Sequence, residues 1–87
     1  MQEIDNKQLL LNSLAKCTQE LRGDKSQFIL ASEYEISTSI ISTIERGLKD
    51  PQLTTVFKLA EALNIEPYEF IKRIQDGLPK DFSLTDK

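Results

Sequence analysis

The chain has 87 residues, with 11 basic and 14 acidic side chains, no histidine and a net charge of −3. This length suits one small domain, and neither a signal peptide nor an apolar run of membrane-spanning length is evident, so we expect a cytoplasmic protein. The sequence has no histidine, phosphate-binding glycine pattern or cysteine pair, which argues against an enzyme and against any metal or cofactor. A single cysteine, Cys17, excludes an intramolecular disulfide.

The spacing of apolar residues predicts an all-α fold of five helices. The first helix is expected over residues 7–21, where apolar side chains recur at intervals of four, three and four, at Leu10, Leu14, Cys17 and Leu21. The most economical interpretation of Cys17 is a small buried apolar side chain, since no histidine is present to activate its thiol. Gly23 suits the left-handed backbone that ends such a helix.

Residues 26–47 contain two short helical patterns that are joined by a tight turn. Each pattern begins at a serine, Ser26 or Ser37, whose hydroxyl is suited to accept the free amides of a first turn. In the first pattern Leu30, Ala31 and Tyr34 fall on one face at helical spacing. In the second, Ile41 and Ile44 face inward, while Thr38, Ser39, Ser42 and Thr43 point away. A short helix with a polar outer face suits insertion into a DNA groove, as in a helix-turn-helix.

Two more helices and a tail complete the predicted single domain, 1–87. After a loop that contains Pro51, a fourth helix is expected over 53–63, with a buried stripe formed by Leu53, Val56, Leu59, Ala60 and Leu63. Asn64 suits the left-handed position that closes this helix. A fifth helix is expected to begin at Pro67 and to stop at Gly77, so the helical core spans about 7–76 and the tail spans 77–87.

The sequence resembles the Cro/lambda-repressor class of helix-turn-helix proteins, also called XRE-like, over roughly residues 14–72. The matching residues are Ser26-Gln27, Leu30-Ala31, Ile36-Ser37, Ile41-Ser42, Ile44-Glu45-Arg46-Gly47, Pro51, Leu53, Leu59-Ala60-Glu61-Ala62-Leu63 and Asn64-Ile65. The resemblance implies a five-helix lambda-repressor-like DNA-binding domain whose helix-turn-helix is formed by the second and third helices. One departure is Glu35, where the family usually has glycine; a glutamate there either carries roughly 1 kcal/mol of strain or adopts a different turn.

The resemblance also implies which residues contact DNA. Thr38, Ser39 and Thr43 occupy the positions that read base edges, and Ile40 lies beside them, where it suits a thymine methyl group. Gln27 matches a position that binds a phosphate. Further contacts to the DNA backbone are expected from Lys25, Ser26, Ser37, Ser42, Lys49 and Thr54. For each of these polar residues alone, the alternative is an ordinary solvated side chain.

Arg22 and Glu45 match a pair of residues that, in this family, joins the first helix to the recognition helix. We therefore expect a structural ion pair, which would leave Arg22 unavailable for phosphate. Residues 22–58 contain five basic and five acidic side chains, so the DNA-reading part is neutral and the acidic excess lies outside it. A neutral surface predicts modest non-specific affinity for DNA, because phosphate neutralisation supplies most of that affinity.

The function that follows is sequence-specific binding of double-stranded DNA by a transcription regulator. A repressor or autoregulator that binds a partly symmetric operator as a homodimer is the usual form among short relatives, with no small-molecule effector domain. The expected dimer interface consists of Phe70, Ile71, Ile74, Leu78 and Phe82; in the alternative, the tail folds back over its own core. A second alternative for function is a protein-interaction module on the same fold, such as an antitoxin or a partner of another regulator, with weak or no DNA binding.

Overall fold

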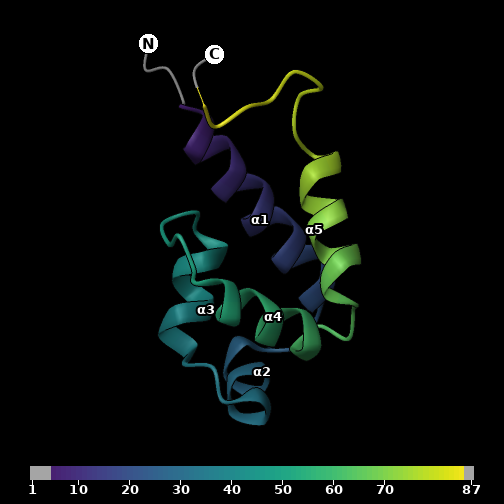
Figure 1. Ribbon diagram of the computed structural model, residues 1–87. Helices are drawn as coiled ribbons and strands as arrows, with labels where there is room; N and C mark the ends of the chain where they lie inside the picture. Colours follow the sequence, from purple (N-terminus) through teal and green to yellow (C-terminus); the bar gives the residue numbers. More distant parts are fainter. Residues whose placement is uncertain (1–4, 86–87) are drawn as a thin grey trace.

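The computed structural model describes residues 5–85; residues 1–4 and 86–87, at the ends of the predicted domain, lie outside the described part. Over this range the chain forms five helices and no strand (Figure 1), which confirms the predicted all-α fold. The helices are α1 (Asn6–Arg22), α2 (Gln27–Tyr34), α3 (Thr38–Glu45), α4 (Leu53–Ala62) and α5 (Pro67–Asp76). None of the described helices is long and apolar enough to cross a membrane.

The helix starts follow the sequence signals. The Ser26 hydroxyl accepts a hydrogen bond from the amide of Ile29 at 3.1 Å, and the Ser37 hydroxyl accepts one from the amide of Ile40 at 3.0 Å, as predicted. Pro67 occupies the first turn of α5, where its missing N–H has no helical acceptor to lose. Each cap satisfies an amide that the helix itself cannot and so helps to stabilise α2 and α3, which have only eight residues each.

Two turns have left-handed backbone at residues that carry a side chain. Glu35 ends α2 with φ 56° and ψ 36°, the conformation that glycine would adopt there at no steric cost. Of the two outcomes expected for Glu35, the structure therefore shows the strained one, with a cost of roughly 1 kcal/mol. Asn64 follows α4 with φ 60°, as predicted.

The core is formed by one cluster of apolar side chains to which every helix contributes. Helix α1 packs against α3 and α5, α2 against α3 and α4, and α4 against α5. The side chains at its centre, each at most 1% exposed, are Leu30, Ile41, Ile44, Leu59, Ala60 and Phe70. Within the helix-turn-helix, α3 is thus held by α1, and α2 is held by α4.

Two side chains on the predicted helix faces are exposed. Leu53, which was expected in the buried stripe of α4, is the first residue of that helix and is 69% exposed. Tyr34 is 39% exposed at the last position of α2, where its ring lies 5.9 Å from the Lys25 ammonium group. Helical spacing predicts the direction of a side chain but not how far its packing partner extends.

The predicted dimer interface is wrong for two of its five residues. Phe70 is fully buried and Ile74 is 5% exposed, because both lie on the side of α5 that packs into the core of the same chain. Ile71 is 45% exposed, and Leu78 and Phe82 are half-buried. The tail itself follows the fold-back alternative.

From α5 the tail runs back across the molecule to the start of α1 (Figure 1). There the Asn6 side-chain amide donates a hydrogen bond to the Ser83 carbonyl at 2.6 Å.

Candidate nucleic-acid interface

Helix α3 packs into the core with one face and presents polar side chains on the opposite face. Ile41 and Ile44 have no exposed surface, so the orientation of the helix about its own axis is set by the core. On the other side Thr38 and Ser39 are exposed, while Ile40 and Thr43 are half-buried. Three of the four predicted base-reading residues therefore present a hydroxyl on the outer side of α3, and Ile40 lies among them.

The Thr43 hydroxyl is already engaged within α3. Its Oγ1 donates to the carbonyls of Ser39, at 3.0 Å, and Ile40, at 2.9 Å. A hydroxyl that donates its only hydrogen still has a lone pair with which to accept. In this rotamer Thr43 is suited to accept from a base amino group, such as N6 of adenine or N4 of cytosine, rather than to donate to a base.

The hydroxyls of the two capping serines, unlike that of Thr43, can still donate a hydrogen bond. Ser26 and Ser37 use oxygen lone pairs to accept backbone amides, so the proton of each hydroxyl remains available. Both stand at the start of an eight-residue helix, where the backbone amides and the helix dipole also favour an anion. This chemistry suits the predicted role of the two serines as donors to DNA phosphates.

The predicted ion pair between Arg22 and Glu45 is present, and its geometry is bidentate. Arg22 Nε donates to Glu45 Oε2 at 2.6 Å and Nη2 donates to Oε1 at 2.8 Å. The Glu45 side chain is 4% exposed and that of Arg22 is 20% exposed. Hydrogen bonding to Glu45 raises the pKa of the Arg22 guanidinium. The pair joins the end of α1 to the end of α3 and removes Arg22 from the basic surface.

Gln27 belongs to the same network. Its side-chain Nε2 donates to Glu45 Oε1 at 2.9 Å, so one of its two amide hydrogens points to the ion pair. The predicted phosphate contact has to use the other hydrogen. Gln27 thereby connects the first turn of α2 to the last turn of α3, and the contact to DNA stays a prediction.

Two further side chains of α1, Gln19 and Gln8, bond to the end of α3 and the turn after it, and Asn12 supports Gln8; none of the three was predicted from the sequence. Gln19 Nε2 donates to the Glu45 carbonyl at 2.6 Å, and Gln8 Nε2 donates to the Gly47 carbonyl at 2.9 Å and to Asn12 Oδ1 at 2.8 Å. Gly47 has φ 72°, and a Cβ there would lie 2.7 Å from Asn12 Oδ1. The spacing of these polar residues places them on one side of α1, but it does not indicate their partners near the end of α3.

The basic side chains near the helix-turn-helix differ in whether a carboxylate pairs with them. Lys25 forms an ion pair with Glu33, which raises the pKa of the Lys25 ammonium group by hydrogen bonding. Lys49 is exposed in the loop after α3, as is Thr54 in the first turn of α4. Arg46, which the prediction omitted although it lies in the matched stretch 44–47, is exposed at the end of α3, and its Nε donates to the Ser42 carbonyl at 3.3 Å.

Within residues 5–85, no three histidine, cysteine, aspartate or glutamate side chains gather in a way that could hold a metal ion. Cys17 is 7% exposed and belongs to the core cluster. Burial raises the pKa of its thiol above the usual value. A protonated, buried thiol is a poor nucleophile, which agrees with the structural role expected for Cys17.

Comparison with known proteins agrees with this geometry. The sequence model of the family described as Helix-turn-helix matches residues 29–70, which begin within α2 and end within α5. The crystal structure of a hypothetical transcription factor, NHTF, from Neisseria is similar at 27% identity and a TM-score of 0.67, covering 92% of this chain and 87% of that one. No curated protein matches. The segment formed by α2 and α3 is a helix-turn-helix of the Cro/lambda-repressor type within a lambda-repressor-like fold, the fold of DNA-binding transcription regulators.

Proposed function

We propose that this protein is a sequence-specific transcription regulator that reads double-stranded DNA through α3. The observation that carries the proposal is the construction of α3. Its outer face bears the small polar side chains of Thr38 and Ser39, its inner face is fixed by the core, and its last residue is clamped to α1 by the Arg22–Glu45 pair. A helix held at both its underside and its end can present those side chains to a groove in one orientation.

In this proposal Thr38, Ser39 and Thr43 contact base edges and Ile40 contacts a thymine methyl group. Hydroxyls discriminate between bases less than bidentate amide or guanidinium groups do, so DNA shape and bridging water supply part of the specificity. The proposed contacts to the DNA backbone are Lys25, Ser26, Gln27, Ser37, Ser42, Lys49 and Thr54, to which the exposed Arg46 is added.

We infer that the regulator binds a partly symmetric operator as a homodimer, acts as a repressor or autoregulator and works in the cytoplasm. Of the predicted interface residues, Ile71, Leu78 and Phe82 remain accessible to a partner in whole or in part. A two-fold contact there has to bring two α3 helices about 34 Å apart, one turn of DNA. Ile71→Glu should convert a dimer to a monomer in sedimentation, whereas Lys72→Glu, at the next position of α5, should not. An unchanged dimer in Ile71→Glu would remove this interface.

A protein-interaction module, whose partner is a toxin or another regulator, is the second candidate. The observation that favours it is the neutral charge of residues 22–58, in which the two cations nearest the start of α2, Arg22 and Lys25, are both paired with glutamates.

Titrating the protein with duplex DNA at two salt concentrations separates the candidates. Affinity that falls steeply with salt supports the DNA-binding regulator. No binding at low salt supports the interaction module. Selection from a random duplex pool then identifies the operator.

A further inference from the structure

Two neighbouring side chains of α3, Ile40 and Thr43, offer different chemistry to a groove. They lie three positions apart, so they are adjacent on the helix surface, with Cβ atoms about 5–6 Å apart. Both are half-buried, and Ile40 packs against the edge of the core. The Thr43 hydroxyl oxygen lies 2.9 Å from the Ile40 carbonyl oxygen. A base pair that meets one of these residues therefore lies within reach of the other.

The Thr43 hydroxyl acts toward DNA as an acceptor. Its hydrogen is shared between the carbonyls of Ser39, at 3.0 Å, and Ile40, at 2.9 Å, in a rotamer that threonine commonly adopts in a helix. The oxygen still has a lone pair, which suits the amino groups of adenine and cytosine. Guanine O6 and N7 are acceptors themselves and need a donor. Thr43 alone therefore leaves adenine and cytosine as alternatives.

Ile40 separates these two alternatives. Thymine, the partner of adenine, carries a methyl group in the major groove, whereas guanine, the partner of cytosine, presents acceptors there. The carboxylate of α3, Glu45, is 4% exposed and paired with Arg22, so it is not available to accept from cytosine. An A·T pair satisfies both Thr43 and Ile40. A C·G pair satisfies Thr43 only and brings the acceptors of guanine beside an apolar side chain.

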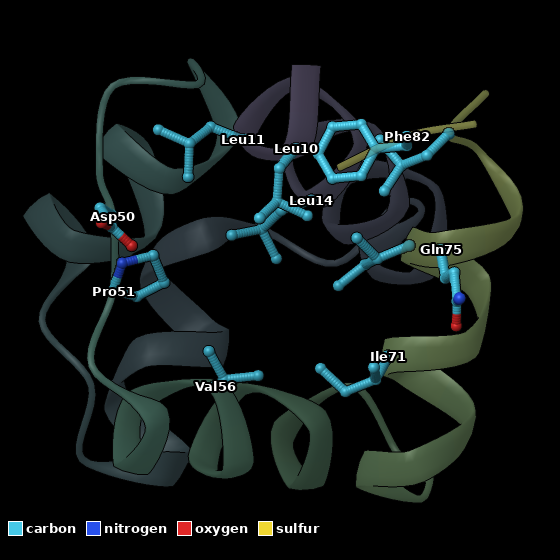
Figure 2. A pocket seen from close by; sticks show the side chains of 11 residues that line it. Leu10, Leu11, Leu14, Asp50, Pro51, Val56, Ile71, Gln75 and Phe82 are labelled. Carbon is cyan, nitrogen blue, oxygen red and sulfur yellow. The ribbon is translucent and has the colours of Figure 1, made fainter. Parts of the chain in front are cut away.

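We propose that Thr43 and Ile40 together select one A·T pair in each half-site of the operator. Thr43 accepts from adenine N6, and Ile40 packs on the methyl group of the thymine in the same pair. This selection rests on the proposed function, since α3 has to lie in the major groove. In the homodimer proposed above, Ile71 and Phe82, which line an apolar hollow beside α5 (Figure 2), belong to the contact between the two copies. The two-fold axis then places the selected pair at symmetric positions.

The first experiment locates the pair with the full chain. Duplexes are selected from a random pool by the wild type and by Thr43→Val, in which the side chain keeps its branched shape but has no oxygen with which to accept. The position at which Thr43→Val relaxes the base preference should be an A·T pair in the wild-type selection. Thr43→Ser retains the hydroxyl and is the matched control, so it should keep the preference.

Altered bases at that position then test the two contacts separately. Replacing adenine by purine removes the N6 amino group and should weaken binding about fivefold more in the wild type than in Thr43→Val. Replacing thymine by uracil removes the methyl group alone, and should weaken the wild type about threefold and leave Ile40→Ala unaffected. Each comparison is a ratio of two duplexes on one variant, so a smaller folded fraction cancels, and circular dichroism verifies that each variant folds.

Three results overturn the proposal: a selected pair other than A·T at the relaxed position, no relaxed position at all, or equal losses with the altered bases in the wild type and in the variants. Any of these together with salt-dependent duplex binding leaves the proposed function standing. No duplex binding at low salt overturns both, so the two failures are distinguishable.

Discussion

Glu45→Ala tests how the recognition helix is held. Glu45 is the most buried carboxylate of the helix-turn-helix, and it accepts hydrogen bonds from Arg22 at 2.6 and 2.8 Å and from Gln27 at 2.9 Å. Removing it leaves the Arg22 guanidinium, 20% exposed, without its carboxylate. Loss of one partner of a buried ion pair typically costs about 3–5 kcal/mol.

We expect the lower end of that range, about 3 kcal/mol, for two reasons. Arg22 reaches the surface at one edge, and its Nη1 also donates to the Lys25 carbonyl at 2.7 Å, so the remaining charge is not wholly unpaired. The assay is urea unfolding followed by circular dichroism, with the exposed residue Glu61 as the matched control. Glu61→Ala should change the free energy of unfolding by no more than about 0.5 kcal/mol.

A double-mutant cycle with Arg22→Ala isolates the pair itself. The two residues are in direct contact, so the cycle should give a coupling free energy of about 1–3 kcal/mol. Additive effects, or a Glu45→Ala variant as stable as Glu61→Ala, would refute the clamp and would return Arg22 to the candidates for phosphate contact.

Three further predictions concern single residues. Glu35→Gly should raise the free energy of unfolding by about 0.5 kcal/mol in urea melts, because relief of the left-handed strain exceeds the added freedom of the unfolded chain; a loss would mean that the turn is unstrained. Gly47→Ala should lower it by at least about 1 kcal/mol, since φ is 72° and the new Cβ meets Asn12; no change in the urea midpoint would show that the loop adapts freely. Native Cys17, whose burial raises the thiol pKa, should react with a thiol reagent at neutral pH at least about tenfold more slowly than in urea, and the native rate should rise with pH; equal rates in the two states would contradict its burial.

The sequence predicted the parts of this structure that depend on local signals. Serine caps begin α2 and α3 where the hydroxyls of Ser26 and Ser37 indicated, and Asn64 has the left-handed backbone that ends α4. The spacing of Ile41 and Ile44 predicted that both lie in the core, because residues three positions apart lie on the same face of a helix, and both are buried. The Arg22–Glu45 pair was predicted from family resemblance rather than from any local pattern.

What the sequence did not predict depends on which helices meet. Phe70 and Ile74 were expected at a dimer interface because their number seemed to exceed the need of one small core, but α5 turns both inward between α1 and α4. The link between Gln8 and Gly47 joins residues 39 positions apart, and nothing in the local sequence pairs them.

Base reading by α3 is tested by the ratio of the affinities for a selected duplex and for a scrambled duplex at one salt concentration, measured in the wild type and in Thr43→Ala. Thr43 is half-buried on α3 and bonded only to its own helix backbone, so the substitution should leave folding nearly unchanged. If α3 reads bases, Thr43→Ala should weaken binding to the selected duplex by about 1 kcal/mol, roughly fivefold, and leave the scrambled duplex unaffected. Equal weakening on both duplexes would show that Thr43 does not read bases and would contradict base reading by α3.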